Sequence, residues 1–250
     1  MLEVLYKDDY FVAVDKPSGL LVHRSMIDKS ETEFAMQIVR DQIGAYVYPV
    51  HRLDKPTSGV LLFALSPEAA RAMSEVFQSG KSTKEYLAIV RGYTDEHEII
   101  DYPLKEQLDK MTDSKANKDK PAQSAITEYR RLATVELPYP VSRYPQARYS
   151  LLHVMPKTGR KHQIRRHMKH IMHPIVGDTK HGRGEHNKLF REKFDAHRLL
   201  LSAIRLSFTH PFTHEVITIE APLDDVMTQL IKTFKWESTL PPELLTQSIS

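Results

Sequence analysis

The sequence contains no cysteine and only one tryptophan among its 250 residues. Without cysteine, disulfides, iron–sulfur clusters, thiolate zinc sites and cysteine nucleophiles are excluded. No apolar run approaches the roughly 20 residues that cross a bilayer, so we expect no membrane-spanning segment. The opening stretch MLEVLYKDDY has neither the basic region nor the apolar core of a signal peptide. These absences together lead us to expect a cytoplasmic protein.

Charge is nearly balanced overall but unevenly distributed. Lys and Arg number 35 against 32 Asp and Glu, which gives a formal net charge of +3. Between Lys157 and Arg205, however, 13 Lys or Arg face only 4 Asp or Glu, and seven histidines lie in the same segment. Such a basic block is typical of a surface that binds a polyanion, because Lys and Arg neutralise phosphates. The alternative is a solvated surface that binds nothing.

Strand and helix patterns interleave along the chain. Strands are expected within residues 2–14, 60–65, 86–90, 124–135, 149–155, 199–208 and 216–219. Helices are expected over 32–43, 66–80, 162–171 and 223–234. Several connections are short enough for hairpins, which predicts an α+β fold with a mixed, largely antiparallel sheet. We expect exposed loops at 105–123 and 137–145, and a mobile tail over 237–250.

A dense polar stretch, HRLDKPTSG at residues 51–59, runs directly into an apolar strand. Its carboxylate, Asp54, lies between Arg52 and Lys55, and neighbouring cations favour the ionised form of a carboxyl group. An ionised carboxylate can serve as a nucleophile or a base. The alternative is a turn in which Asp54 caps backbone amides and the cations are ordinary surface residues.

A second unusual stretch, KTGRKHQIRRHM at residues 157–168, combines a glycine turn with the start of a helix. A helix N-terminus beside cationic side chains suits a phosphate. Arg165 follows Lys161 by one helical turn whereas Arg166 points elsewhere, so one arginine can face the protein while others face a ligand. The phosphate-binding candidates are Lys157, Arg160, Lys161, His162, Arg166 and Lys169.

Metal and nucleotide chemistry find little support in the sequence. His167, His170 and His173 recur at three-residue spacing, but they lack the H-E-x-x-H pattern of a zinc site and a thiolate companion. No G-x-x-x-x-G-K-[ST], G-x-G-x-x-G or G-x-S-x-G motif is present. We therefore expect neither a metal nor a cofactor.

Five blocks of the sequence resemble, in the same order, those of the RluA-type pseudouridine synthases. They are residues 16–19 (KPSG), 51–59 (HRLDKPTSG), 84–88 (KEYLA), 158–167 (TGRKHQIRRH) and 173–178 (HPIVGD). The resemblance spans about residues 1 to 222. It implies the pseudouridine synthase fold, with a sheet flanked by helices and a cleft across the middle. Residues 1–236 are then one catalytic domain with two halves around that cleft.

The resemblance also implies roles for individual residues. Asp54 matches the essential aspartate, Tyr86 the tyrosine that stacks on the flipped uracil, and Arg165 the basic partner of the aspartate. Arg52 matches the arginine that fills the space left by the flipped base, and Leu201 is expected against the uracil. His51 is grouped with these base-flipping residues. The sequence departs from the usual pattern at Lys55, where many relatives have Arg, and at Ser202, where they usually have His, which bears on RNA contacts or packing.

The substrate implied by the resemblance is RNA. Residues 20–25, 101–104 and 133–136 resemble members of the family that modify uridine 65 of certain tRNAs. The S4 RNA-binding module frequent in the family is not expected, so recognition must come from the catalytic domain, which favours a compact RNA such as tRNA. The alternatives are a synthase acting on ribosomal RNA, a non-catalytic RNA-binding module and, more remotely, a metal-dependent nuclease. We expect a monomer with no protein partner.

Overall fold

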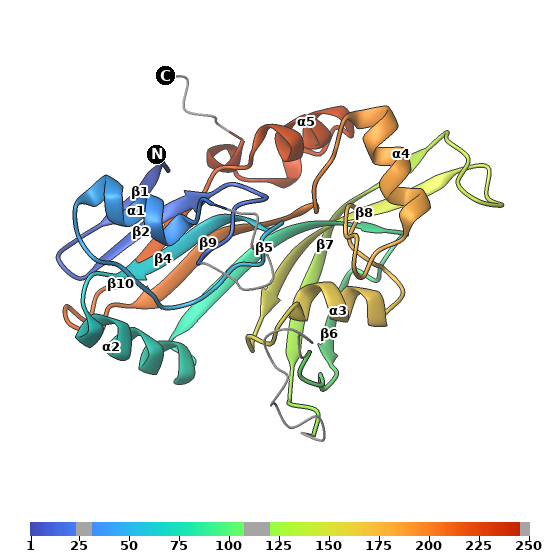
Figure 1. Cartoon of the computed structure of the whole chain (residues 1–250). Coiled ribbons are helices and arrows are strands. Elements are labelled where there is room, and N and C mark those ends of the chain that lie inside the picture. The colour runs from blue at the N-terminus through green and yellow to red at the C-terminus, as the bar shows by residue number, and fades with distance from the viewer. Residues whose placement is uncertain (24–31, 108–120, 246–250) are drawn as a thin grey trace.

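The computed structural model describes residues 1–23, 32–107 and 121–245 (Figure 1). Ten strands form one sheet in the order β1-β2-β4-β9-β5-β8-β7-β6, with β3 beside β4 and β10 beside β9. The strands are β1 (Val4–Lys7), β2 (Phe11–Lys16), β3 (Tyr48–Pro49), β4 (Ser58–Ala64), β5 (Ser82–Arg91), β6 (His97–Asp101), β7 (Ile126–Leu137), β8 (Ala147–Pro156), β9 (Leu201–Thr209) and β10 (Val216–Glu220). The helices are α1 (Ala35–Ile43), α2 (Pro67–Gln78), α3 (Gln163–His170), α4 (Gly184–Phe194), α5 (Asp225–Thr233), η1 (Glu237–Thr239) and η2 (Pro242–Leu244).

Strand pairing in the sheet is antiparallel with one exception. β4 and β9 run parallel and pair at Ser58 with Ser202 and at Gly59 with Ala203. The remaining pairs, including β5 with both β8 and β9, are antiparallel. This mixed, largely antiparallel sheet with helices packed on it confirms the predicted α+β class.

Helices cover both faces of the sheet. In β4, Leu62 packs in the cluster that contains Met73 of α2, whereas Leu61 packs in the cluster that contains Val39 of α1. Successive side chains of a strand point to opposite faces, so α1 and α2 lie on opposite sides, as Figure 1 shows. Because both faces of β4 are buried, its sequence is a continuous apolar run.

The same arrangement recurs in the other half of the sheet. Leu87 of β5 packs in the cluster formed with α4 and α5, and Ala88 packs in the cluster that contains Met168 of α3. Helices α2 and α3 lie below the sheet in Figure 1, and the site described below lies between them.

Helix α2 was predicted correctly because its sequence carries the signals of a helix start and of a buried face. Ser66 caps it by accepting a hydrogen bond from the Ala69 amide at 3.0 Å, and Pro67 occupies the first turn. Proline fits there because its missing N–H would have had no partner within the helix. Ala69, Met73 and Val76 form the buried stripe.

The sequence-based elements differ from the structure in several places. The helix expected from residue 32 begins at Ala35, and β6 and α4 were not predicted. Of the loop expected over 105–123, residues 108–120 lie outside the described part. The excursion at 137–145 is a connection between β7 and β8, closed by hydrogen bonds between Val141 and Tyr144.

The mobile tail expected from residue 237 is wrong for residues 237–245. This stretch forms η1 and η2, and Leu240 and Leu244 are buried in the same cluster as α5. The Leu223 amide also donates to the Leu244 carbonyl at 3.0 Å. Two apolar side chains spaced four residues apart were enough to attach the segment to the core. In the described ranges, no helix is long and apolar enough to cross a membrane.

Candidate active site

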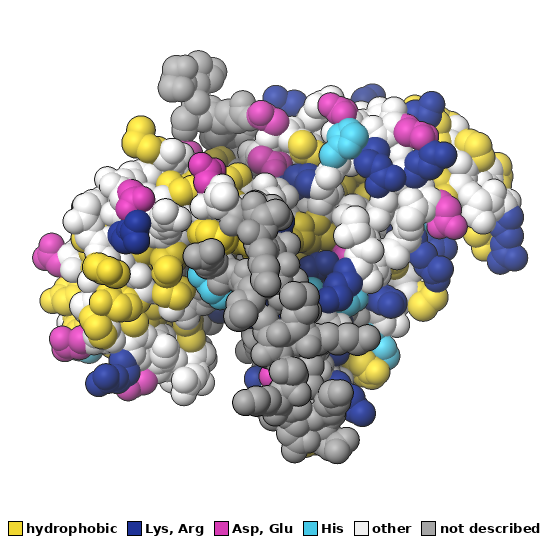
Figure 2. Space-filling model, in the orientation of Figure 1, with side chains coloured by type: hydrophobic (Ala, Val, Ile, Leu, Met, Phe, Trp, Pro, Cys, Tyr) yellow, Lys and Arg dark blue, Asp and Glu magenta, His cyan; other side chains and the backbone are white. Residues whose placement is uncertain are grey.

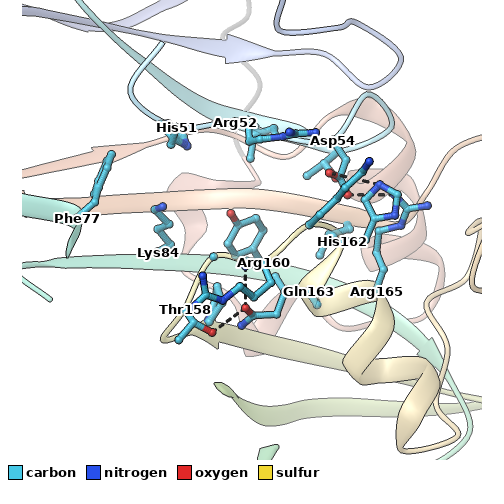
Figure 3. A pocket seen from close by; sticks show the side chains of 18 of the residues that line it. His51, Arg52, Asp54, Phe77, Lys84, Thr158, Arg160, His162, Gln163 and Arg165 are labelled. Carbon is cyan, nitrogen blue, oxygen red and sulfur yellow. Dashed lines mark hydrogen bonds and ion pairs between the residues drawn. The ribbon is translucent and has the colours of Figure 1, made fainter. Parts of the chain in front are cut away.

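A cavity of about 400 Å³ lies between the two halves of the molecule (Figure 3). Its walls come from residues 50–57, from the segment 156–165, and from single residues of α2, β5 and β9. The two polar stretches singled out in the sequence therefore meet in space, although about a hundred residues separate them along the chain. The single residues are Phe77, Lys84, Tyr86 and Leu201.

Asp54 lies in the loop that leads into β4. Its carbonyl accepts a hydrogen bond from the Thr57 amide at 2.9 Å, which closes the turn before the strand. Its carboxylate Oδ2 accepts a hydrogen bond from Arg165 Nη1 at 3.0 Å, and the side chain is 17% exposed. The alternative in which Asp54 caps backbone amides is not what this geometry shows, because the carboxylate faces Arg165 across the cavity.

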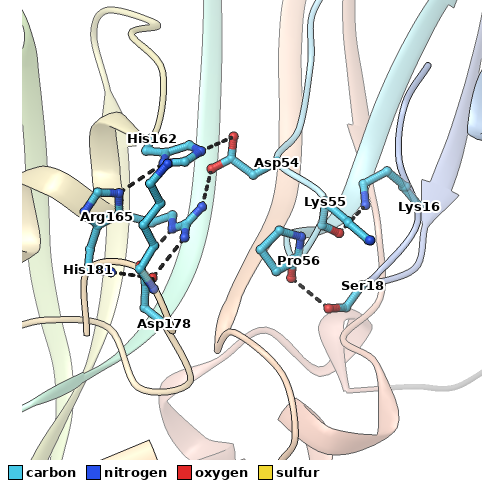
Figure 4. A network of polar contacts seen from close by, with 10 residues as sticks. Lys16, Ser18, Asp54, Lys55, Pro56, His162, Arg165, Asp178 and His181 are labelled. Carbon is cyan, nitrogen blue, oxygen red and sulfur yellow. Dashed lines mark hydrogen bonds and ion pairs between the residues drawn. The ribbon is translucent and has the colours of Figure 1, made fainter. Parts of the chain in front are cut away.

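The loop carrying Asp54 is attached to the preceding KPSG segment (Figure 4). Lys16 is fully buried, and its ammonium donates to the carbonyls of Pro17, Leu20 and Lys55 at 2.9, 2.7 and 3.1 Å. Ser18 adds a hydrogen bond from Oγ to the Pro56 carbonyl at 2.8 Å. These contacts hold the two residues that follow Asp54, and so restrict where the carboxylate can lie.

Arg165 connects Asp54 to a second carboxylate, Asp178. Arg165 Nε and Nη2 donate to the two oxygens of Asp178 at 2.7 and 2.9 Å, while Nη1 is directed at Asp54 (Figure 4). Asp178 also accepts the amides of Lys180 and His181, each at 2.9 Å. Burial raises the pKa of the Asp178 carboxyl, but the hydrogen bonds and charge of Arg165 outweigh it, so that the pKa lies below its usual range. The two parallel hydrogen bonds from Arg165 to Asp178 fix the plane of the guanidinium group.

His162 lies beside the same pair. It adopts a left-handed backbone conformation with φ of 55°, and its Nδ1 lies 3.0 Å from His181 Nε2. Its Nε2 lies 3.9 Å from Asp54 Oδ1. Burial lowers the pKa of His162 to about 4, so the ring is neutral near pH 7. His162 therefore lines the cavity next to the carboxylate, and its expected contact with a phosphate stays a prediction.

Tyr86 and Leu201 form the floor of the cavity. They come from neighbouring strands, β5 and β9, and Tyr86 packs against the apolar cluster that contains Leu201 and Ile164. Burial raises the pKa of the Tyr86 hydroxyl, and the Asp54 carboxylate adds to the effect. The phenol therefore stays protonated at neutral pH, beside the apolar side chains of Leu201 and Ile164 in the cavity wall.

The basic residues expected to bind phosphate divide into two groups. Arg160 and Lys161 line the cavity with His162, and Arg160 Nε also donates to the Ser124 carbonyl at 3.0 Å. Lys157, Arg166 and Lys169 do not line it. Figure 2 shows Lys and Arg gathered over the half that carries α3 and α4. The basic block is thus partly cavity wall and partly surrounding surface.

Those outer residues each have a distinct environment. Lys157 Nζ lies 2.9 Å from Glu128, Arg166 is half-buried, and Lys169 lines a separate hollow together with Arg91 and Arg183.

Of the residues assigned to base flipping, Arg52 is exposed at the cavity.

His51 takes part in the fold as well as in the cavity wall. Its Nε2 accepts the Leu62 amide at 2.9 Å, and its ring makes an edge contact with Phe77.

Sequence reasoning missed the supporting residues of the site. Asp178 lay within a family block, but no role had been assigned to it. Gln163 was also overlooked: its Oε1 accepts from Thr158 Oγ1 at 2.7 Å and from the Arg160 amide at 3.0 Å. The unusual Ser202 lies 3.0 Å from Ser58 by their hydroxyl oxygens, at the crossing of β4 and β9. Ser202 is buried, so this hydrogen bond joins two neighbouring strands inside the sheet.

A family model described as RNA pseudouridylate synthase matches residues 10–170. The protein "tRNA pseudouridine synthase C" of Vibrio vulnificus is 58% identical over 240 residues, which are 96% of this chain and 98% of that protein. Its namesake in Haemophilus influenzae is 55% identical over 95% of this chain and 100% of its own length. The chain belongs to the RNA pseudouridylate synthase family. The resemblance stated from the sequence is thereby confirmed, and this RNA pseudouridylate synthase is an isomerase that converts uridine to pseudouridine in RNA.

Solved structures agree on the fold of this RNA pseudouridylate synthase. "Human RNA Pseudouridylate Synthase Domain Containing 1" superposes with a TM-score of 0.67 over 94% of this chain and 95% of its own, at 23% identity. "Human RNA Pseudouridylate Synthase Domain Containing 4" gives 0.68 over 93% of both chains, also at 23% identity. Among the described residues, no group of three or more His, Asp or Glu is arranged to hold a metal ion.

Proposed function

We propose that this chain converts a uridine of tRNA to pseudouridine, with Asp54 as the catalytic carboxylate. The observation that carries the proposal is the Asp54–Arg165 pair at 3.0 Å in a cavity floored by Tyr86 and Leu201. The relatives that are 51–58% identical bear the name tRNA pseudouridine synthase C, which supports tRNA as the substrate. Uridine 65 is the position that we propose as the target.

The reaction breaks the C–N glycosidic bond and makes a C–C bond to the same ribose, so the detached base must be held while it turns. A carboxylate can act by attack at C1′, by attack at C6, or by assisting loss of the C2′ proton. Each route uses Asp54 as the carboxylate, in contact with an opposite charge. Arg165 supplies the opposing charge, and no redox or metal chemistry is needed.

The remaining assignments follow from placement around the cavity. Tyr86 stacks on the uracil over the apolar floor, Leu201 packs against it, and exposed Arg52 enters the gap left in the RNA. His51 holds the loop that carries Arg52. Base extrusion costs a few kcal/mol, and phosphate contacts offset part of this cost. The residues proposed to supply those contacts are Arg160, Lys161 and His162 at the cavity and Lys157, Arg166 and Lys169 around it.

We further propose that residues 1–236 act as one catalytic domain, against which residues 237–245 pack, that the protein works as a monomer in the cytoplasm, and that it needs no protein partner. The monomer is testable by sedimentation or light scattering of the protein with and without tRNA. A dimer that persists on dilution would overturn this part of the proposal.

The test of the reaction is tritium release from tRNA labelled at uridine C5, with purified protein in EDTA. Wild-type protein should release tritium, and Asp54→Asn should reduce the rate by at least about 10³-fold while retaining RNA binding, because only the reacting group is lost. Release by the Asn variant at the wild-type rate would refute the assignment of Asp54.

Mapping the product separates the possible substrates. Pseudouridine at position 65 of tRNA supports the proposed target, and release from ribosomal RNA alone would replace tRNA as the substrate. If neither RNA releases tritium but both bind tightly, the result would favour a non-catalytic RNA-binding module.

A further inference from the structure

The cavity continues past Tyr86 to a second end, away from the Asp54–Arg165 pair. Figure 3 shows His51, Phe77 and Lys84 together on the side opposite Asp54 and Arg165. They come from the loop before β4, the last turn of α2 and the start of β5, respectively. Phe77 and Lys84 have no role in the reaction proposed above, and His51 enters it only by holding the loop that carries Arg52.

Lys84 has no anionic partner in the part of the chain that the structure describes. Its Nζ lies 4.4 Å from the centre of the Phe77 ring, and it forms no ion pair or hydrogen bond with any described residue. Its neighbour Glu85, in contrast, is paired with Arg205 at 3.1 Å and with His153 at 2.7 Å. Burial lowers the pKa of the Lys84 ammonium. A partly desolvated ammonium is unfavourable unless a negative group compensates it, and a ring face does so only in part.

His51 provides a second, independent observation at the same place. Because its Nε2 accepts the Leu62 amide, the neutral ring carries its hydrogen on Nδ1, and this buried nitrogen has no hydrogen-bond partner. Burial also lowers the pKa of His51 to about 3, so the ring remains neutral and keeps this tautomer. Around Phe77 there are thus two donors and no acceptor from the described part of the protein.

We propose that Lys84 binds the phosphodiester group of a nucleotide adjoining the target uridine. The cleft would then hold the flipped nucleoside at Asp54 and a backbone phosphate of the same strand at Lys84. A phosphate fits better than a base because the Lys84 ammonium has no anionic partner among the described residues and already covers the face of Phe77 on which a base would stack. This inference rests on the proposed RNA substrate. It adds the direction in which the RNA strand runs along the cavity, from Asp54 toward Lys84.

The test combines a charge change in the protein with single charge changes in the RNA. A tRNA stem–loop carrying the target uridine is prepared as a series, each member with one neutral methylphosphonate linkage near that uridine. For wild-type protein, one linkage adjoining the uridine should weaken binding by about tenfold, the effect of a charge-assisted hydrogen bond. Lys84→Gln should bind the unmodified RNA about tenfold more weakly and be insensitive to that same linkage.

Lys81→Gln is the matched control, because Lys81 is exposed just before β5 and does not line the cavity. It should remain as sensitive to the neutral linkage as wild type. The slope of log Kd against the logarithm of the salt concentration should be smaller by about 0.7 to 0.9 for Lys84→Gln, because one phosphate contact is lost. If Lys84→Gln loses affinity at every neutral linkage as wild type does, the proposal is overturned. Thermal unfolding of the variant shows whether any loss comes from misfolding.

Failure of this inference is distinguishable from failure of the reaction. Binding is measured without turnover, so a protein that forms no pseudouridine can still show the coupling between Lys84 and one phosphate. Conversely, activity with no such coupling overturns the Lys84 site alone. A loss in kcat at saturating RNA, with KM unchanged, would place Lys84 in the chemistry and also overturn its assignment to phosphate binding.

Discussion

A single buried arginine joins the two carboxylates of this site. Arg165 is 6% exposed and Asp178 is 1% exposed, so neither has water to replace a lost partner. Asp178 occupies Nε and Nη2, which leaves Nη1 for Asp54. Asp178 is therefore a positioning residue: it acts on the reaction through the direction in which it holds Arg165.

Replacing Asp178 with Asn should slow the reaction without abolishing it. The amide keeps the shape but removes the charge and one acceptor, so Arg165 is less firmly held and the Asp54 contact loosens. Small misplacements of catalytic groups cost up to about 10²-fold, and we expect kcat to fall by about that factor with little change in KM. Single-turnover rates at saturating tRNA measure this, and a wild-type kcat in Asp178→Asn would contradict it. Asp195→Asn, at a side chain 92% exposed, is the control.

How much of the site could be read from the sequence depended on the kind of residue. Asp54, Arg52 and the basic residues near 160 form conspicuous polar stretches, and the resemblance assigned their roles. Asp178 lies in a block that the resemblance marked without giving it a role, and His181 lies just beyond that block, so their roles appear only from contact with Arg165 and His162. Lys84 begins the KEYLA block but received no role from the sequence, and only the structure shows that it has no anionic partner among the described residues.

At the scale of the elements, the parallel pair β4–β9 brings two backbones unusually close. At Gly59, with φ of +109°, a Cβ atom would lie 2.0 Å from the Ala203 carbonyl oxygen. Only glycine tolerates both the backbone conformation and the approach. This close approach of β4 and β9 lies directly after the loop that carries Asp54, so it also sets the position of Asp54.

Gly59→Ala should therefore be strongly destabilising, by more than about 3 kcal/mol, because backbone atoms must move to admit the methyl group. Gly44→Ala is the matched control: its φ is +68°, but nothing lies within 4 Å of the added atom. The control should lose only about 1–2 kcal/mol, the cost of the left-handed conformation. Urea unfolding gives both values, and equal losses in the two variants would show that the contact with Ala203 is unimportant.

Elements with a strong local signal were predicted, and elements defined by their neighbours were not. Helix α2 has a capping serine, a proline in its first turn and an apolar stripe. Strand β6 lies at the edge of the sheet and buries only Ile100, so it carries no apolar alternation. Helix α4 is mostly polar and buries only Asn187, Leu189 and Phe190. Neither leaves a pattern that can be read before the sheet is known.

For the molecule as a whole, strand order is what the sequence could not supply. The loop before β4 and the segment before α3 meet because β9 and β5 lie between β4 and β8 in the sheet. That order follows from the summed packing of four apolar clusters, which no single segment encodes. The attachment of residues 237–245 has the same origin, since Leu240 and Leu244 find their partners in α5 and β9.

Buried histidines make the stability of the whole molecule depend on pH. Burial lowers the pKa of His51 from 6.5 to about 3, and those of His162 and His186 to about 4. The unfolded chain therefore binds protons below pH 6.5 that the folded protein does not accept until about pH 4. Stability is unaffected above this window and falls as the pH decreases through it, because protonation then favours the unfolded state.

Each of these histidines contributes at most about 1.4 kcal/mol per pH unit to the slope, the value for one proton bound by the unfolded chain alone. Urea unfolding between about pH 7.5 and pH 4.5 measures it, in a range where most carboxylates have not yet titrated. His186→Gln should reduce the slope, since it removes one proton acceptor from the unfolded chain only. His197→Gln, at a side chain 63% exposed, should leave the slope unchanged. If both variants have the wild-type slope, buried histidines are not the cause, and acid sensitivity must come from carboxylates such as Asp178.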